Sequence, residues 1–165
     1  MSRKTIYLAS PLGFAHSTRP FMATLIDQLS QHVEVLNPWD RTEFDEEFAR
    51  LANENDFASR REQLRKINAE LGRLNAQDID RANGLFAILD GVDVDSGTAA
   101  EIGFAYARGK YICGLRTDFR LSADNYGSTV NLQVEYFIES SGGTIVHTAE
   151  DLANLAEGYS SREVG

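Results

Sequence analysis

The segment richest in groups able to do chemistry runs from residue 90 to 103 and reads DGVDVDSGTAAEIG. Asp95 and Ser96 are residue types that cap a helix N-terminus, and Gly97 would let a ligand approach the backbone closely. Glu101 follows among small or apolar neighbours, so it would not lie on an ordinary solvated face. One interpretation makes Glu101 only a favourable charge near a helix N-terminus. The other makes it a carboxylate nucleophile at a sugar carbon, as in retaining glycoside hydrolysis.

Aromatic residues elsewhere in the chain could complete a site around that carboxylate. Tyr7 lies in an apolar run, and a buried Tyr hydroxyl needs a partner, which a nearby carboxylate would provide. Phe14 and Trp39 could form apolar walls for a planar ligand or could be ordinary packing. We find no Ser-His-Asp or Cys-His arrangement, no Gly-x-Ser-x-Gly elbow, no P-loop and no dinucleotide-binding glycine motif. The sequence therefore favours carboxylate chemistry.

The elements that would position these residues alternate along the chain. Short apolar runs predict strands that are buried on both faces, at residues 6–9, 33–36, 85–89, 111–115 and 144–146. Helical patterns lie between them, at about 20–29, 43–81 (one broken helix or two successive ones), 98–108, 130–139 and 149–155. This alternation predicts a doubly wound α/β fold of flavodoxin-like or Rossmann-like type, with a five-stranded parallel sheet flanked by helices.

In such folds ligands bind beyond the carboxyl ends of the strands. The site is therefore expected among residues 10–14, 37–40, 90–101 and 116–131. This placement makes Ser10, Phe14, Trp39 and Gly97 candidates for substrate binding.

Length and charge narrow the class of protein. The chain has 165 residues, which predicts a single domain over 1–165, and a formal charge of −9. That acidic balance disfavours a binder of polymeric nucleic acid or of an anionic membrane, since both need a surplus of Lys and Arg. A single cysteine, Cys113, fits the reducing cytoplasm, and the three His residues lack ligand spacing, so no metal is expected. No apolar stretch is long enough to predict a membrane span or a signal peptide.

Two stretches resemble a known family. The sequence YLASP at 7–11 and DSGTAAEIGFA at 95–105 are similar to the nucleoside 2-deoxyribosyltransferases, as are Gly109-Lys110 and Asn131-Leu132. The family's elements follow in order from residue 4 to about 147. The resemblance implies transfer of a 2-deoxyribosyl group between nucleobases, through a covalent glycosyl-enzyme and with retention at C1′. It implies a 2′-deoxynucleoside donor, a free nucleobase acceptor and no cofactor.

The resemblance also implies a role for individual residues. Glu101 matches the nucleophile and Tyr7 the tyrosine that holds it in place. Asp95 matches the aspartate that binds the 5′-hydroxyl. Asn131 matches an asparagine that reaches the same hydroxyl from a neighbouring subunit, which implies a homo-oligomer built from dimers, such as a hexamer.

At one position the chain departs from the family. Asn75 stands where many members carry Asp near the leaving base. An amide can hydrogen-bond a base but cannot deliver a proton as a carboxylic acid would. Asp78 could substitute only if the helix register allowed it. The loops at about 12–19 and 39–45 are expected to line the base pocket.

The residue at position 95 also bears on the choice of substrate. Relatives that hydrolyse nucleoside 5′-monophosphates tend to have Ser where this chain has Asp95, and a carboxylate repels a phosphate dianion. Free 2′-deoxynucleosides are therefore favoured. Arg116 and Arg120 could instead bind phosphate, or could pair with local carboxylates such as Asp118. Two alternatives stay open: an N-glycoside hydrolase acting on 2′-deoxynucleosides or their 5′-monophosphates, and a non-enzymatic nucleoside-binding module.

Overall fold

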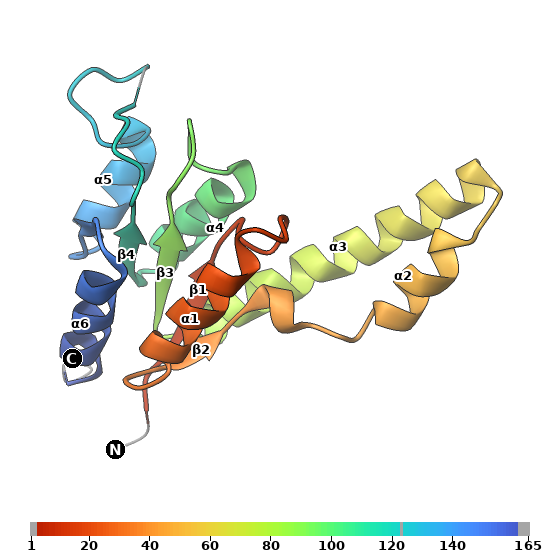
Figure 1. Cartoon of the computed structure of the whole chain (residues 1–165), viewed down its shortest axis with the longest axis horizontal. Coiled ribbons are helices and arrows are strands. Elements are labelled where there is room, and N and C mark those ends of the chain that lie inside the picture. The colour runs from red at the N-terminus through yellow and green to blue at the C-terminus, as the bar shows by residue number, and fades with distance from the viewer. Residues whose placement is uncertain (1–2, 123, 162–165) are drawn as a thin grey trace.

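The computed structural model describes residues 3–122 and 124–161 and is built around one parallel β-sheet (Figure 1). Its strands are β1 (Thr5–Ala9), β2 (Glu34–Leu36), β3 (Gly84–Ile88), β4 (Tyr111–Leu115) and β5 (Ile145–Val146). They lie in the order β2-β1-β3-β4-β5, and every neighbouring pair is parallel. The predicted α/β fold with five parallel strands is confirmed.

The prediction that all five strands are buried on both faces is wrong at the two sheet edges. In β1, β3 and β4 nearly every residue is buried, whereas the residues of β2 and β5 are partly or fully exposed. An edge strand has a neighbour on one side only, so its residues are less completely covered. A short apolar run indicates a strand but does not tell its place in the sheet.

Helices cover both faces of the sheet. They are α1 (Arg19–Leu29), α2 (Asp45–Ala52), α3 (Phe57–Arg81), α4 (Ser96–Ala107), α5 (Leu132–Ser140) and α6 (Ala149–Ser160), with a 3-10 turn η1 (Pro38–Asp40) that the sequence pattern did not predict. One core cluster joins the sheet to α1 and α6, and a second joins its other face to α3, α4 and α5. The region 43–81 forms two helices, because Asp56 ends the break between them by accepting hydrogen bonds from the backbone N–H groups of Ala58 and Ser59.

The strand order changes direction between β1 and β3. The chain runs outward from β1 to β2 and then returns to place β3 on the other side of β1. The segments that follow β1 and β3 therefore diverge at one edge of the sheet, where such folds leave a crevice for ligands.

Helices α2 and α3 form an arm that projects from the body of the sheet (Figure 1). The end of α3 nearest the sheet packs against α4 and β1, while α2 packs on α3. Within the described part of the chain, no helix combines the length and apolar character that crossing a membrane requires.

Candidate active site

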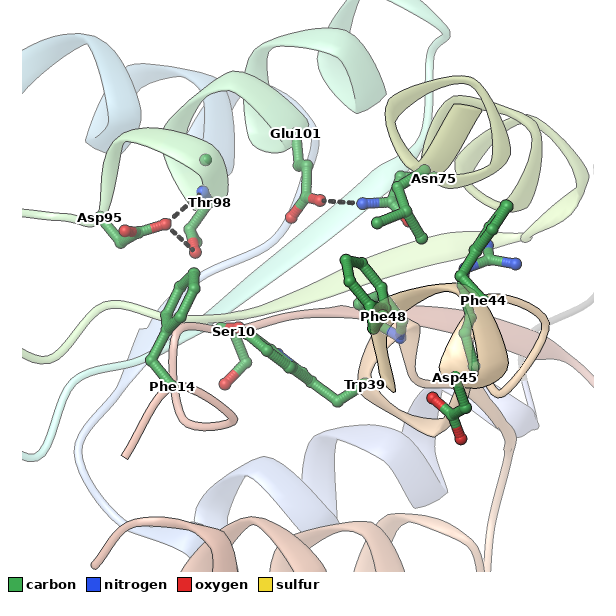
Figure 2. Close-up of a pocket in the computed structure, with 14 residues that line it drawn as sticks. Ser10, Phe14, Trp39, Phe44, Asp45, Phe48, Asn75, Asp95, Thr98 and Glu101 are labelled. Carbon is green, nitrogen blue, oxygen red and sulfur yellow. Dashed lines mark hydrogen bonds between the residues drawn. The ribbon is translucent and has the colours of Figure 1, made fainter. Parts of the chain in front are cut away.

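A pocket of about 430 Å³ opens where the segments after β1 and β3 diverge. Figure 2 shows Asp95, Thr98 and Glu101 of α4 and its N-cap on one side, with Phe14 and Trp39 facing them. The structure brings most of the sequence-predicted residues to this pocket: Ser10, Phe14, Trp39, Asn75, Asp95, Gly97 and Glu101. These residues come from four separate segments of the chain, and the fold brings the four segments together at the crevice of the sheet.

The carboxylate of Glu101 has two polar partners from other elements. The hydroxyl of Tyr7, which lies in β1 and is fully buried, donates to Glu101 Oε1 at 2.7 Å. Asn75 Nδ2, from α3, donates to the same oxygen at a longer 3.5 Å (Figure 2). Glu101 lies in the second turn of α4, slightly further into the helix than the sequence pattern suggested. Its carboxylate is thereby held toward the pocket from two sides.

Burial controls the protonation of this pair. Desolvation raises the pKa of Glu101, and the nearby Asp95 charge raises it further, while the hydrogen bonds from Tyr7 and Asn75 lower it. Desolvation and the Glu101 charge also raise the pKa of Tyr7 well above its ordinary value. Tyr7 therefore stays protonated and acts as a donor, which fixes the orientation of the carboxylate.

Asp95 caps the N-terminus of α4. Its Oδ2 accepts hydrogen bonds from Thr98 N at 3.0 Å and from Thr98 Oγ1 at 3.3 Å (Figure 2). Both bonds use the same oxygen, so the other carboxylate oxygen can accept from a ligand hydroxyl. Gly97 lies beside it on the pocket wall.

The charge of Asp95 leads to a prediction about pH dependence. The nucleophile role that the sequence predicts for Glu101 requires its ionised form, so kcat/KM is expected to fall below the pKa of Glu101 as pH decreases. Because Asp95 raises that pKa, Asp95→Asn should move the acid limb of the profile to lower pH. Measuring kcat/KM against pH for both proteins checks this shift. An unchanged limb, or one that moves to higher pH, would show that Asp95 does not act on Glu101 through its charge.

The apolar wall is built from aromatic rings. Phe14 and Trp39 meet edge to face, with ring centroids 4.6 Å apart and an interplanar angle of 80°. Trp39 Nε1 donates to the carbonyl of Ser10 at 2.7 Å, which holds the indole beside the end of β1. A Cβ at Gly13 would lie 2.0 Å from the Trp39 ring, so only glycine permits this approach.

The pocket also contains residues that the sequence pattern did not single out as site residues. Phe44 and Phe48 fall one helical turn apart at the start of α2, and together with Leu71 they extend the apolar lining, while Arg41 adds a cation. Arg41 and Phe44 fall in the loop at about 39–45 that the sequence predicted to line the base pocket, although neither was named as a site residue. For Phe48 the signal available was its i,i+4 spacing from Phe44. That spacing does not distinguish a pocket from ordinary packing.

Asn131 does not line this pocket. It caps α5, where its side chain accepts from Gln133 N at 3.0 Å. Asp78 also lies outside the pocket lining and pairs instead with Arg41 and Arg81. Asp78 is thus engaged in ion pairs rather than placed beside Glu101.

The two arginines considered for phosphate binding are engaged elsewhere. Arg116 is buried, and its guanidinium donates to the backbone carbonyls of Leu89, Gly91 and Arg120. Arg120 pairs with Asp118, and this contact holds the pKa of Asp118 well below its usual range. Neither arginine lines the pocket. Across residues 3–122 and 124–161, no three His, Cys, Asp or Glu side chains cluster in a way that could hold a metal ion.

Comparisons with known proteins show the family of the chain and its fold. A family model described as nucleoside 2-deoxyribosyltransferase matches residues 6–155. No curated protein matches the chain.

Among solved structures, a conserved protein from Enterococcus faecalis V583 is 24% identical over 96% of this chain and 99% of its own, with a TM-score of 0.68. A 2-deoxyribosyltransferase from Leishmania mexicana is 21% identical over 93% of this chain and 97% of its own, with a TM-score of 0.64. The CMP N-glycosidase BcmB of Clostridium botulinum is 20% identical over 94% of this chain and 99% of its own, with a TM-score of 0.53. These structures share the fold.

Proposed function

Because the chain belongs to the nucleoside 2-deoxyribosyltransferase family, we propose that it transfers a 2-deoxyribosyl group from a 2′-deoxynucleoside to a free nucleobase. The observation that carries this proposal is the carboxylate of Glu101, held by the Tyr7 hydroxyl at 2.7 Å inside a pocket with aromatic walls. A carboxylate fixed in this way can attack a sugar carbon, and aromatic walls suit a planar base.

The reaction has two displacement steps. In the first, a carboxylate oxygen of Glu101 forms a bond to C1′, and the C1′–N bond breaks with its electron pair leaving on the base. In the second, a nitrogen of the incoming base attacks C1′ and releases the carboxylate. Each step inverts C1′, so the product retains the β configuration. Written this way, the reaction uses no metal or organic cofactor.

Asp95 is proposed to bind the 5′-hydroxyl of the sugar. Its cap bonds to Thr98 occupy one carboxylate oxygen, and the other can accept a hydrogen bond from a neutral hydroxyl. A 5′-phosphate would instead meet a like charge in a partly desolvated pocket, which favours unphosphorylated nucleosides. Asn75 and Ser10, with Phe14 and Trp39, are proposed to surround the base.

We also propose that the protein is a homo-oligomer built from dimers. Asn131 does not line the pocket of its own chain, which supports the proposal that it serves the 5′-hydroxyl in the site of a neighbouring subunit. A fully active enzyme that sediments as a monomer at assay concentration would contradict this arrangement.

A second candidate function is hydrolysis on the same scaffold, with water accepting the sugar from Glu101. The presence of a CMP N-glycosidase among the structural neighbours supports hydrolysis as the second candidate. The two functions share the first step and differ in whether a base or water enters the second.

The deciding experiment incubates the protein with deoxyinosine, with and without adenine. Transfer predicts deoxyadenosine, formed only when adenine is present, and little free deoxyribose. Hydrolysis predicts free deoxyribose and hypoxanthine regardless of adenine. Repeating the assay with the 5′-monophosphate tests the role of Asp95, since a faster reaction with the phosphate would contradict it. A wider screen of donors and acceptor bases, including ribonucleosides, follows if neither product forms.

A further inference from the structure

Arg41 is the cation in the pocket lining. It follows η1 and its side chain is 14% exposed. One terminal nitrogen, Nη1, lies 3.4 Å from Glu43 Oε1, and the other, Nη2, donates to Asp78. The guanidinium is therefore anchored by two acidic side chains, neither of which is Glu101.

The third nitrogen of this guanidinium has no protein partner. Arg41 Nε is buried and makes no hydrogen bond among the described residues, and the same is true of Asn75 Oδ1 in the same pocket. Buried polar groups are nearly always paired. Both atoms have almost no exposed area in the empty pocket, so a small shift of the two side chains on binding would bring them to a ligand. A nucleobase carries both acceptors and donors on its edges and can meet this need.

The first chemical step also requires a hydrogen-bond donor beside the departing base. When the C1′–N bond breaks, the base carries away the electron pair and becomes negatively charged. Asn75 cannot supply a proton to it, and Asp78 is held in ion pairs with Arg41 and Arg81. A charged N–H donor that keeps its proton can still stabilise the developing anion by hydrogen bonding.

The positive charge of Arg41 acts on the Tyr7 hydroxyl that holds Glu101. Burial and the Glu101 charge raise the pKa of Tyr7, and the charge of Arg41 opposes them more strongly than Asp78 supports them. The ion pair with Asp78 therefore leaves a net positive influence at Tyr7, the hydrogen-bond partner of Glu101.

We propose that Arg41 stabilises the departing base, by donating a hydrogen bond from Nε to an acceptor atom of that base as the C1′–N bond breaks. This inference rests on the proposed function only in requiring base release through Glu101. No proton moves from Arg41. The base that leaves as its anion takes a proton from water, and in transfer the incoming base gives one up, so the exchange is balanced. Arg41 would thus replace, by charge, the acid that Asn75 cannot be.

The test uses donors that share deoxyribose and differ in the acidity of the base, such as 5-substituted deoxyuridines or substituted purine deoxynucleosides. Base release in a single turnover is measured for wild type, Arg41→Met and Arg41→Lys. Removing the donor should slow release of the least acidic base by about 100-fold. The loss should shrink as the base becomes more acidic, because a more stable anion needs less help. Arg41→Lys keeps a cation for Asp78 but lacks Nε, so it should show the same steeper dependence on base acidity.

The matched control is Arg81→Gln. Arg81 also pairs with Asp78, at 2.8 Å, but it is 64% exposed and does not line the pocket. Its loss should leave both the rates and their dependence on base acidity unchanged. An equal loss across all donors in the Arg41 variants, or no loss, overturns the inference. Because base release is measured, the inference survives if water rather than a base accepts the sugar. Absence of release from every donor by wild type would overturn the proposed function as well.

Discussion

Glu101→Gln is expected to abolish base exchange, with a fall of roughly 10⁴–10⁶-fold in kcat. Glutamine keeps the volume of the side chain and can still accept the hydrogen bond from Tyr7, so the pocket and the fold should persist. What is lost is the negatively charged oxygen that forms the bond to C1′. The measurement is the rate of deoxyadenosine formation from deoxyinosine and adenine, together with nucleoside binding by calorimetry, which should remain close to that of wild type.

The control for this variant is Glu139→Gln, which changes an exposed carboxylate on α5 and should leave exchange unchanged. Covalent trapping gives an independent readout. A slow 2-fluoro nucleoside should add the mass of the fluorinated sugar to the peptide that contains residue 101 in wild type, and not in Glu101→Gln. Near-normal exchange in Glu101→Gln would refute the assignment. Binding without any adduct or exchange in wild type would instead indicate a non-enzymatic nucleoside-binding protein.

Tyr7→Phe is expected to lower kcat/KM by about 10–100-fold near neutral pH, because it removes the donor that orients the nucleophile. The same hydrogen bond lowers the pKa of Glu101, so its loss should raise that pKa. The acid limb of kcat/KM should therefore move to higher pH in Tyr7→Phe. A profile of kcat/KM against pH measures both effects at once.

Tyr126→Phe provides the control, since Tyr126 is a fully exposed loop residue and should leave the profile unchanged. The directions of shift make the test specific. Tyr7→Phe and Asp95→Asn should move the acid limb in opposite directions, whereas general damage to the protein would lower the rate without moving the limb. A Tyr7→Phe profile with the wild-type limb would contradict a direct effect of the hydroxyl on Glu101.

Local sequence was sufficient for the strands, for the helices other than the 3-10 turn η1, and for the choice of one candidate carboxylate. Strands and helices leave periodic patterns of apolar residues, and each pattern depends only on near neighbours in the chain. The break at residue 56 is local as well, since Asp56 caps α3 through its own following residues. Glu101 could be singled out because the small and apolar residues around it are adjacent in sequence.

Sequence was less informative where a residue's surroundings come from distant segments. Tyr7 and Glu101 are 94 residues apart, and their contact depends on β1 lying beside β3. The resemblance to a family suggested this pair, whereas periodicity alone could not. The exposure of β2 and β5 also followed from strand order, which an apolar run does not record.

The composition of the pocket was decided by tertiary structure. Asn75 and Asp78 lie within one turn of α3, yet the first contacts Glu101 and the second pairs with Arg41. The spacing of Phe44 and Phe48 predicts one face of a helix. In the structure both residues line the pocket, because α2 packs against α3.

The sequence by itself thus determined the fold class and the candidate carboxylate Glu101, since both follow from patterns among residues that are close in the sequence. The tertiary structure decided which side chains share the desolvated space around that carboxylate. Burial in this shared space raises the pKa of Glu101, and among the residues that the structure describes the Nε of Arg41 has no hydrogen-bond partner. Desolvation and charge act through space, over distances that bear no relation to separation along the chain.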